Sequence, residues 1–215
     1  MSRLGRMLQV WPTNRHEQAI AAERGLRAPL PVVRRVGFAS LRGGSGCSTA
    51  ARGVTSTLRG RRSGGILLID GSDALPTRPH VSHAGGARAP EITLTDWGAL
   101  DAARLSIISA SSHVLCLTTT TERSAVQQAL DAAAFTLESG TPTVLIASAV
   151  RGRATAATRR MLSSAPIPIF LLPFDHSTRY VEHGARTSAS AFALATIGAE
   201  IVRLCARPTS EARVA

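Results

Sequence analysis

The residues Ser-Leu-Arg-Gly-Gly-Ser-Gly-Cys-Ser-Thr at positions 40–49 decide how the whole chain is interpreted. The apolar residues 36–39 precede them and have the character of a strand, whereas Ala50, Val54 and Leu58 follow at helical spacing. A glycine-rich turn between a strand and a helix lets the backbone approach a phosphate and offers it the free N–H groups of a helix N-terminus. The stretch therefore predicts a phosphate-binding loop.

This loop lacks the charge of the standard motif. The usual phosphate-binding loop ends in Gly-Lys-Ser/Thr, whereas this one ends in Gly46, Cys47 and Ser48. All 25 basic residues of the chain are arginine. No lysine elsewhere in the sequence can therefore replace the missing one.

The loop resembles the deviant phosphate-binding loop of the MinD/ParA-like ATPases, which reads Lys-Gly-Gly-x-Gly-Lys-Thr-Thr. Arg42 matches the signature lysine of that family, Cys47 its phosphate-binding lysine and Ser48 its magnesium-binding hydroxyl. Ser40 and Leu41 are most similar to the MinD-like proteins encoded beside actinobacterial type VII secretion systems, which begin Ser-Leu-Lys-Gly-Gly. The resemblance extends over roughly residues 20 to 205, but the match to the motif itself is imperfect.

The resemblance implies further site residues at the ends of later strands. Residues 66–70 are a continuous apolar run ending in Asp70, as strands buried on both faces are. The segment Asp96-Trp97-Gly98 resembles the Walker B and switch element of the family, and its alternative is an edge strand ending in a turn. Residues 173–175 resemble the Ile-Pro-x-Asp loop over the adenine. The nucleotide-binding residues so implied are Arg42, Gly43, Gly44, Ser45, Gly46, Cys47, Ser48, Thr49, Asp70, Asp96, Pro173 and Asp175, with Ser48 and Asp96 holding magnesium if nucleotide binds.

Two further positions depart from the family in the same direction as Cys47. Ser72 stands where many relatives use an aspartate to position water. Residues 147–149 read Ala-Ser-Ala where several nucleotide-binding relatives have an asparagine that reads adenine. Both departures indicate a degenerate nucleotide site.

The alternation of apolar strands and helical segments from Val36 onward defines the fold class. We expect strands at residues 36–39, 66–70, 91–96, 114–118, 144–147 and 167–172. We expect further helices at residues 99–111, 125–138 and 189–206. This order predicts an α/β protein with the three-layer P-loop NTPase (Rossmann-like) fold, in which a mostly parallel sheet carries helices on both faces.

We expect three segments along the chain. Residues 1–31 are a basic lead-in, residues 32–207 a MinD/ParA-like P-loop domain and residues 208–215 a loose tail. Within the lead-in, the stretch from Met1 to Trp11 is either a small amphipathic anchor for a membrane or partner, or a frayed tail or a helix packed on the domain. Residues 16–27 are expected to form a solvated helix.

The amino-acid composition limits the functions that the protein can have. The 215 residues suffice for one sizeable domain. A formal net charge of +11 favours anionic partners, although an arginine-only composition explains part of the excess. The three cysteines are widely spaced and form no CxxC pair, which indicates free thiols and a cytoplasmic protein. No signal peptide and no apolar run of transmembrane length is evident.

Three patterns leave alternatives open. A cluster of four arginines forms either a non-specific DNA-binding patch, as in ParA-like proteins, or a solvated helix face. Its members are Arg151, Arg153, Arg159 and Arg160. The pair His80 and His83 is a weak metal signal with no cysteine or acidic cluster beside it. Cys47 at a helix N-terminus is either a reactive thiol of lowered pKa or a small core residue in the place of the lysine.

These observations predict a pseudo-ATPase with weak or lost nucleotide binding that acts as a binding component of type VII secretion or Tad pilus machinery. The resemblance implies ATP and magnesium as cofactors. The alternatives are an active ATPase that uses Arg42 and a non-specific DNA-binding partition factor. We expect a monomer or a heteromer with an ATPase paralogue in the cytoplasm, peripheral to the membrane if the stretch from Met1 to Trp11 anchors it.

Overall fold

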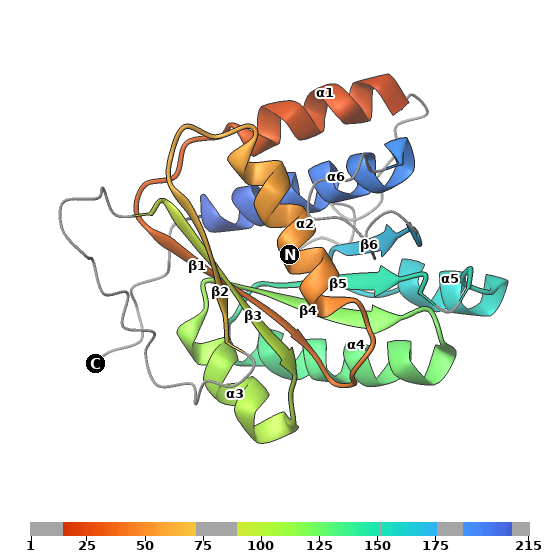
Figure 1. The fold of residues 1–215 in the computed structure, drawn as a ribbon. Coiled ribbons are helices and arrows are strands. Elements are labelled where there is room, and N and C mark those ends of the chain that lie inside the picture. Colours follow the sequence, from red (N-terminus) through yellow and green to blue (C-terminus); the bar gives the residue numbers. More distant parts are fainter. Residues whose placement is uncertain (1–14, 72–89, 151, 176–186, 208–215) are drawn as a thin grey trace, which may run out of the picture.

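A six-stranded parallel sheet lies at the centre of the computed structural model, which describes residues 15–71, 90–150, 152–175 and 187–207 (Figure 1). The strand order across the sheet is β2-β3-β1-β4-β5-β6, and every neighbouring pair is parallel. The strands are β1 (Arg34–Ser40), β2 (Ile66–Asp70), β3 (Ile92–Ala99), β4 (Val114–Thr120), β5 (Thr143–Ser148) and β6 (Ile169–Leu172). The α/β fold expected from the sequence is confirmed.

Helices cover both faces of the sheet because the central strands present apolar side chains on both sides. On one face α2 (Cys47–Arg59) and α6 (Ser188–Cys205) pack against the strands, and α1 (Arg15–Leu26) lies against α6 (Figure 1). The other face is covered by α3 (Ala102–Ser111), α4 (Arg123–Glu138) and α5 (Ala156–Ser163). Two separate apolar clusters result, one on each side of the sheet.

Strand β3 is longer than expected. It runs to Ala99, beyond the expected end at Asp96, and it lies between β2 and β1, so the alternative of an edge strand is wrong. Trp97 continues the strand because its side chain is buried in the apolar cluster on the α3 and α4 face. Asp96 therefore lies inside the sheet, 6% exposed, and not in a turn.

Helix α1 is only partly solvated, which corrects the expectation for residues 16–27. Ala22 and Leu26 are buried, and Leu26 belongs to the apolar cluster formed around α2 and α6. Its remaining residues are largely exposed, as expected. The helix is thus packed on the domain along one edge.

Helix α6 is, among the described helices, the one long and apolar enough to cross a membrane, with a mean hydropathy of 1.4 over 18 residues. More than half of that stretch is buried inside the protein. Ile197, Ile201 and Val202 are fully buried in the cluster shared with α2. Burial in the core therefore accounts for the composition of this helix.

Two buried arginines join distant parts of the chain. The Nε of Arg34, at the start of β1, donates to the carbonyl oxygen of Cys205 at the end of α6 at 2.7 Å. Arg62, which follows α2, donates to both carboxylate oxygens of Glu91 and to the carbonyl oxygens of Leu26 and Ala28. The end of α1, the turn after α2 and the start of β3 are thereby held together.

Candidate functional site

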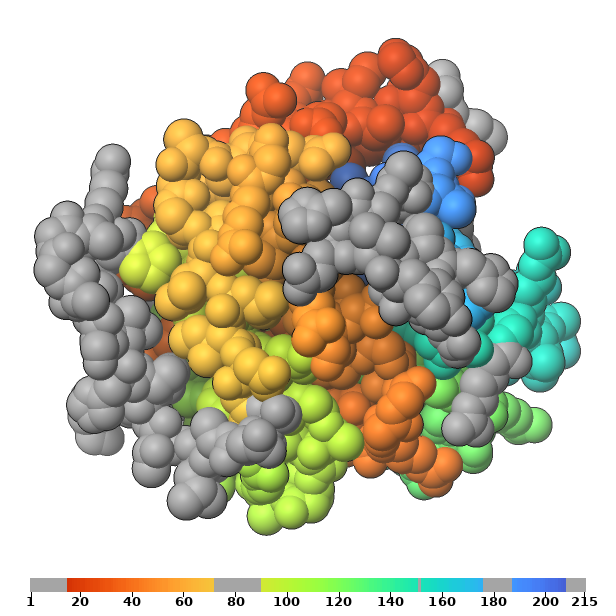
Figure 2. All heavy atoms as spheres, viewed as in Figure 1, coloured from red at the N-terminus to blue at the C-terminus, as the bar shows by residue number. Residues whose placement is uncertain are grey.

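The loop between β1 and α2 has the backbone shape that its glycines predict. Gly44 and Gly46 adopt φ angles of 74° and 85°, and Gly46 is the N-cap of α2. A Cβ at Gly46 would lie 3.1 Å from the Oγ of Ser148, so the loop approaches β5 closely. The loop and α2 reach the molecular surface (orange in Figure 2).

Hydroxyl groups fasten this loop to the sheet. The Oγ of Ser45 lies 3.1 Å from the Oγ1 of Thr118 in β4, and both side chains are buried. Ser40 donates to the carbonyl oxygen of Arg42 at 3.0 Å. These contacts help to hold the loop in its curved shape.

Cys47 occupies the position of the phosphate-binding lysine, and its side chain is turned into the protein. Its Sγ donates to the Oδ1 of Asp96 at 3.4 Å, and the backbone N–H of Gly98 donates to the same oxygen at 3.1 Å. Burial, followed by the nearby charge of Asp96, raises the pKa of the Cys47 thiol to about 12. The residue is therefore neutral at physiological pH and supplies no charge to the loop.

This pKa corrects the hypothesis of a reactive thiol at Cys47. A helix N-terminus lowers the pKa of an accessible thiol, but burial dominates here. Cys116 and Cys205 are also buried, and burial raises the pKa of both thiols. The interpretation of Cys47 as a small core residue is the one that its burial supports.

We predict that the three thiols of the native protein resist alkylation at pH 8. Ionisation of a thiol with a pKa of about 12 leaves roughly one molecule in ten thousand as thiolate at that pH, and the thiolate is the nucleophile. Mass spectrometry after iodoacetamide treatment should show no adduct natively and three adducts in guanidinium. Rapid native labelling that maps to Cys47 would contradict the buried geometry.

The two strand-end carboxylates expected at the site are neighbours. Asp70 and Asp96 are directly paired in register between β2 and β3, at the carboxyl ends where parallel sheets bind ligands. Asp70 is exposed and Asp96 is buried. Ser48, in the first turn of α2, is half-buried, and Thr49 is exposed. These four residues thus lie at the carboxyl ends of the strands, on the same side of the sheet as the glycine loop.

Asp175 fastens the last loop of the site to helix α6. Its buried Oδ2 accepts hydrogen bonds from the backbone N–H of Thr187 at 2.9 Å and from its hydroxyl at 3.1 Å. Thr187 is also the N-cap of α6 and accepts from the backbone N–H of Ser190. Asp175 therefore has a structural role at the start of α6, while Pro173 beside it is half-buried.

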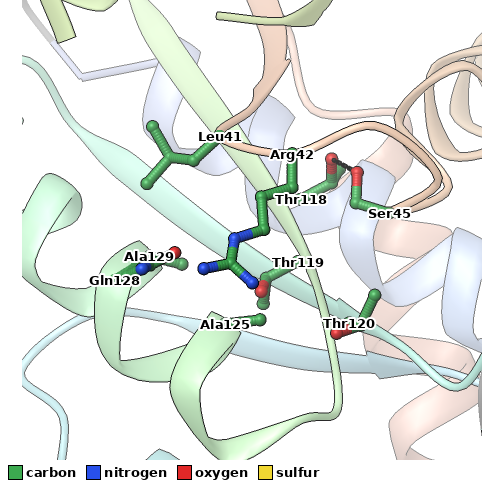
Figure 3. A pocket seen from close by; sticks show the side chains of 9 residues that line it. All are labelled: Leu41, Arg42, Ser45, Thr118, Thr119, Thr120, Ala125, Gln128 and Ala129. Atoms are coloured by element: carbon green, nitrogen blue, oxygen red, sulfur yellow. Dashed lines mark hydrogen bonds between the residues drawn. The ribbon is translucent and has the colours of Figure 1, made fainter. Parts of the chain in front are cut away.

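Arg42 points away from the centre of the loop. Its side chain lies in a small pocket between the loop and α4, with the guanidinium next to Thr119, Ala125 and Gln128 (Figure 3). The sequence interpretation did not include Thr119 and Gln128. Four consecutive threonines, residues 118–121, directly before a helix were the signal that could have identified this part of the site.

Ser148 is a second residue whose surroundings the sequence did not reveal. Its hydroxyl is buried below Gly46 and has no hydrogen-bond partner in the described part of the chain. Several residues that the sequence analysis considered lie outside the described residues. They are Ser72, His80, His83, Arg151 and the stretch from Met1 to Trp11. Among those described, no group of three or more histidine, cysteine or acidic side chains is placed to hold a metal.

The fold is similar to those of solved MinD- and ParA-type proteins. One similar structure is the septum site-determining protein MinD from Pyrococcus horikoshii complexed with Mg-ADP. Its TM-score is 0.60 at 16% identity, and the match covers 79% of this chain and 96% of that chain. Another, from Borrelia burgdorferi and described as a plasmid partition protein bound to AMPPNP, has a TM-score of 0.59 at 13% identity and covers 79% and 99%.

A third similar structure is the cell division ATPase MinD from Pyrococcus furiosus, with a TM-score of 0.56 at 14% identity and coverage of 80% and 99%. No protein-family model matches the sequence, and no curated protein matches it significantly. At these identities the similarity establishes the fold. The chemistry of this chain must be argued from its own residues.

Proposed function

We propose that this protein is a pseudo-ATPase with the MinD/ParA-type fold, which acts by binding another protein and not by hydrolysing ATP. The observation that carries the proposal is the hydrogen bond from the buried, neutral Cys47 thiol to Asp96. In phosphoryl transfer by this class of fold, the loop lysine stabilises the charge of the phosphates and the strand-end aspartate holds magnesium. In this protein the lysine charge is absent, because Cys47 stands in its place. The carboxylate of Asp96 already accepts hydrogen bonds from Cys47 and Gly98.

The fit of Mg-ATP to these residues is therefore incomplete. The backbone cradle of Gly44, Gly46 and the start of α2 suits a phosphate, because it offers free N–H groups and a positive helix end. The side chains do not suit hydrolysis, since Asp96 Oδ1 already accepts from Cys47 and Gly98. Weak binding of phosphate groups without turnover is the outcome that this combination supports.

The alternative of an active ATPase requires Arg42 to take the place of a lysine. Its guanidinium is directed towards α4, next to Thr119 and Gln128 (Figure 3). A planar guanidinium also differs from an ammonium in size and hydrogen-bond geometry. The position of Arg42 thus favours the pseudo-ATPase.

A secretion context follows from the residues that precede the loop. Ser40 and Leu41 resemble the start of the motif in MinD-like proteins of type VII secretion loci, and Tad pilus assembly is the competing system. The proposed role is that of a cytoplasmic binding component that contacts a secretion protein or an ATPase paralogue. Co-purification with the products of neighbouring genes would test this assignment.

We predict no ATP turnover above background by the purified full-length chain with magnesium. Phosphate release should equal that of a buffer blank, because the lysine charge is missing and Asp96 is engaged. The matched control is Ser48→Ala, which removes the hydroxyl at the magnesium position. Turnover that exceeds the blank and disappears in Ser48→Ala would contradict the proposal, whereas turnover unaffected by the substitution would come from a contaminant.

A further inference from the structure

We propose that the pocket between the glycine loop and α4 binds a carboxylate group of an acidic protein partner. The residues that carry the site are Arg42, Thr119 and Gln128, which come from the loop, β4 and α4 (Figure 3). The site lies beside the phosphate cradle and not inside it. The inference rests on the proposed binding role and names the chemistry of the partner.

Arg42 supplies a positive charge that has no counter-ion among the described residues. Its side chain is exposed, and it makes no hydrogen bond or ion pair with the residues that the structure describes. Figure 3 shows the guanidinium over the pocket, towards the end of β4 and the first turns of α4. A cation held in this way is available to an incoming anion.

Thr119 supplies a hydroxyl at the wall of the pocket. The residue is 5% exposed and lines the pocket, yet its hydroxyl forms no hydrogen bond within the described ranges. Its neighbours differ: Thr118 bonds to the carbonyl oxygen of Ala39 and to Ser45, and Thr120 accepts from the backbone N–H of Glu122. The Thr119 hydroxyl is thus available to donate a hydrogen bond to a group that enters the pocket.

Helix α4 adds two further donors. The side-chain amide of Gln128 lines the pocket and makes no hydrogen bond with the described residues. The helix has 16 residues and begins at this pocket, and its N-cap residue, Glu122, provides no side-chain cap. The positive end of the helix macrodipole therefore also favours an anion here.

The shape and the walls of the pocket favour a carboxylate over a nucleotide. The pocket volume is about 20 Å³, far below the range of roughly 300 to 1,000 Å³ that is usual for small-molecule sites, so only a small group can enter it. Leu41, Ala125 and Ala129 form apolar walls around the polar groups. A planar guanidinium binds the two oxygens of a carboxylate in parallel. The net charge of +11 further attracts an acidic partner.

The test is an NMR titration of the isotopically labelled full-length chain. Sodium acetate is the first probe, with ionic strength held constant by sodium chloride, and the signals of Thr119, Gln128 and the Arg42 guanidinium are followed. We expect saturable shifts at these signals. Arg42→Gln and Thr119→Val should each weaken acetate binding by about tenfold. The matched control is Arg52→Gln, which removes the same charge from an exposed position on α2.

Two further probes distinguish the sources of the anion. A capped peptide with one central aspartate should bind more tightly than acetate, and the asparagine version should not bind. Inorganic phosphate should shift the amides of the glycine loop without displacing acetate. The proposal is overturned if no saturable shift occurs, if the shifts persist in Arg42→Gln, if acetate binds but the peptide does not, or if phosphate displaces acetate. None of these outcomes depends on ATP turnover.

Discussion

Replacing Cys47 with lysine will tighten ATP binding by about 10- to 100-fold. A hydrogen bond to a charged group contributes about 1.5–3 kcal/mol, and each 1.4 kcal/mol corresponds to a factor of ten in affinity. The backbone of the glycine loop already has its curved shape, held by the hydroxyl contact between Ser45 and Thr118. The introduced ammonium group would also have Asp96 as a partner in the absence of nucleotide.

Calorimetric titration with ATP and magnesium measures this effect. The control is Cys47→Met, which lengthens the side chain without adding charge and should leave the affinity unchanged. Both variants need a native circular dichroism spectrum, because Cys47 is buried. If a folded Cys47→Lys protein binds ATP no more tightly than the parent, the loop does not bind phosphates and the cradle in our proposal is wrong.

The fold was largely predictable because its strands are continuous apolar runs. The run 66–70 is a strand over the same residues in the structure, since a strand buried in a parallel sheet needs apolar side chains on both faces. The end of β3 was not predictable in this way. A buried aspartate inside a strand contradicts the usual pattern, and the burial of Trp97 becomes visible only in the folded chain.

The candidate site was predictable in composition but not in contacts. The order of motifs identifies Cys47 and Asp96 separately, whereas their hydrogen bond depends on how α2 and β3 meet across the sheet. The pocket that holds Arg42 likewise forms where the loop meets β4 and α4, which lie far along the chain. Side-chain direction is a tertiary property, and local patterns contain no information on it.

The stability of the domain should depend strongly on Arg62, and we predict that Arg62→Ala lowers the free energy of unfolding by about 3–5 kcal/mol. That is the usual cost of removing one partner of a buried ion pair. The side chain of Arg62 is 5% exposed, and its loss would leave Glu91 and the carbonyl oxygens of Leu26 and Ala28 without their donor.

The adjacent arginine provides the matched control for this measurement. Arg61 pairs with Glu23 at 2.6 Å, but both side chains are more than a third exposed, so Arg61→Ala should cost about 0–1 kcal/mol. Arg62→Lys should fall between the two, because one ammonium group cannot reach the carboxylate and both carbonyl oxygens together. Urea unfolding followed by far-ultraviolet circular dichroism gives all three values. Equal losses for Arg61→Ala and Arg62→Ala would show that the buried hydrogen bonds of Arg62 do not hold α1 and β3 together.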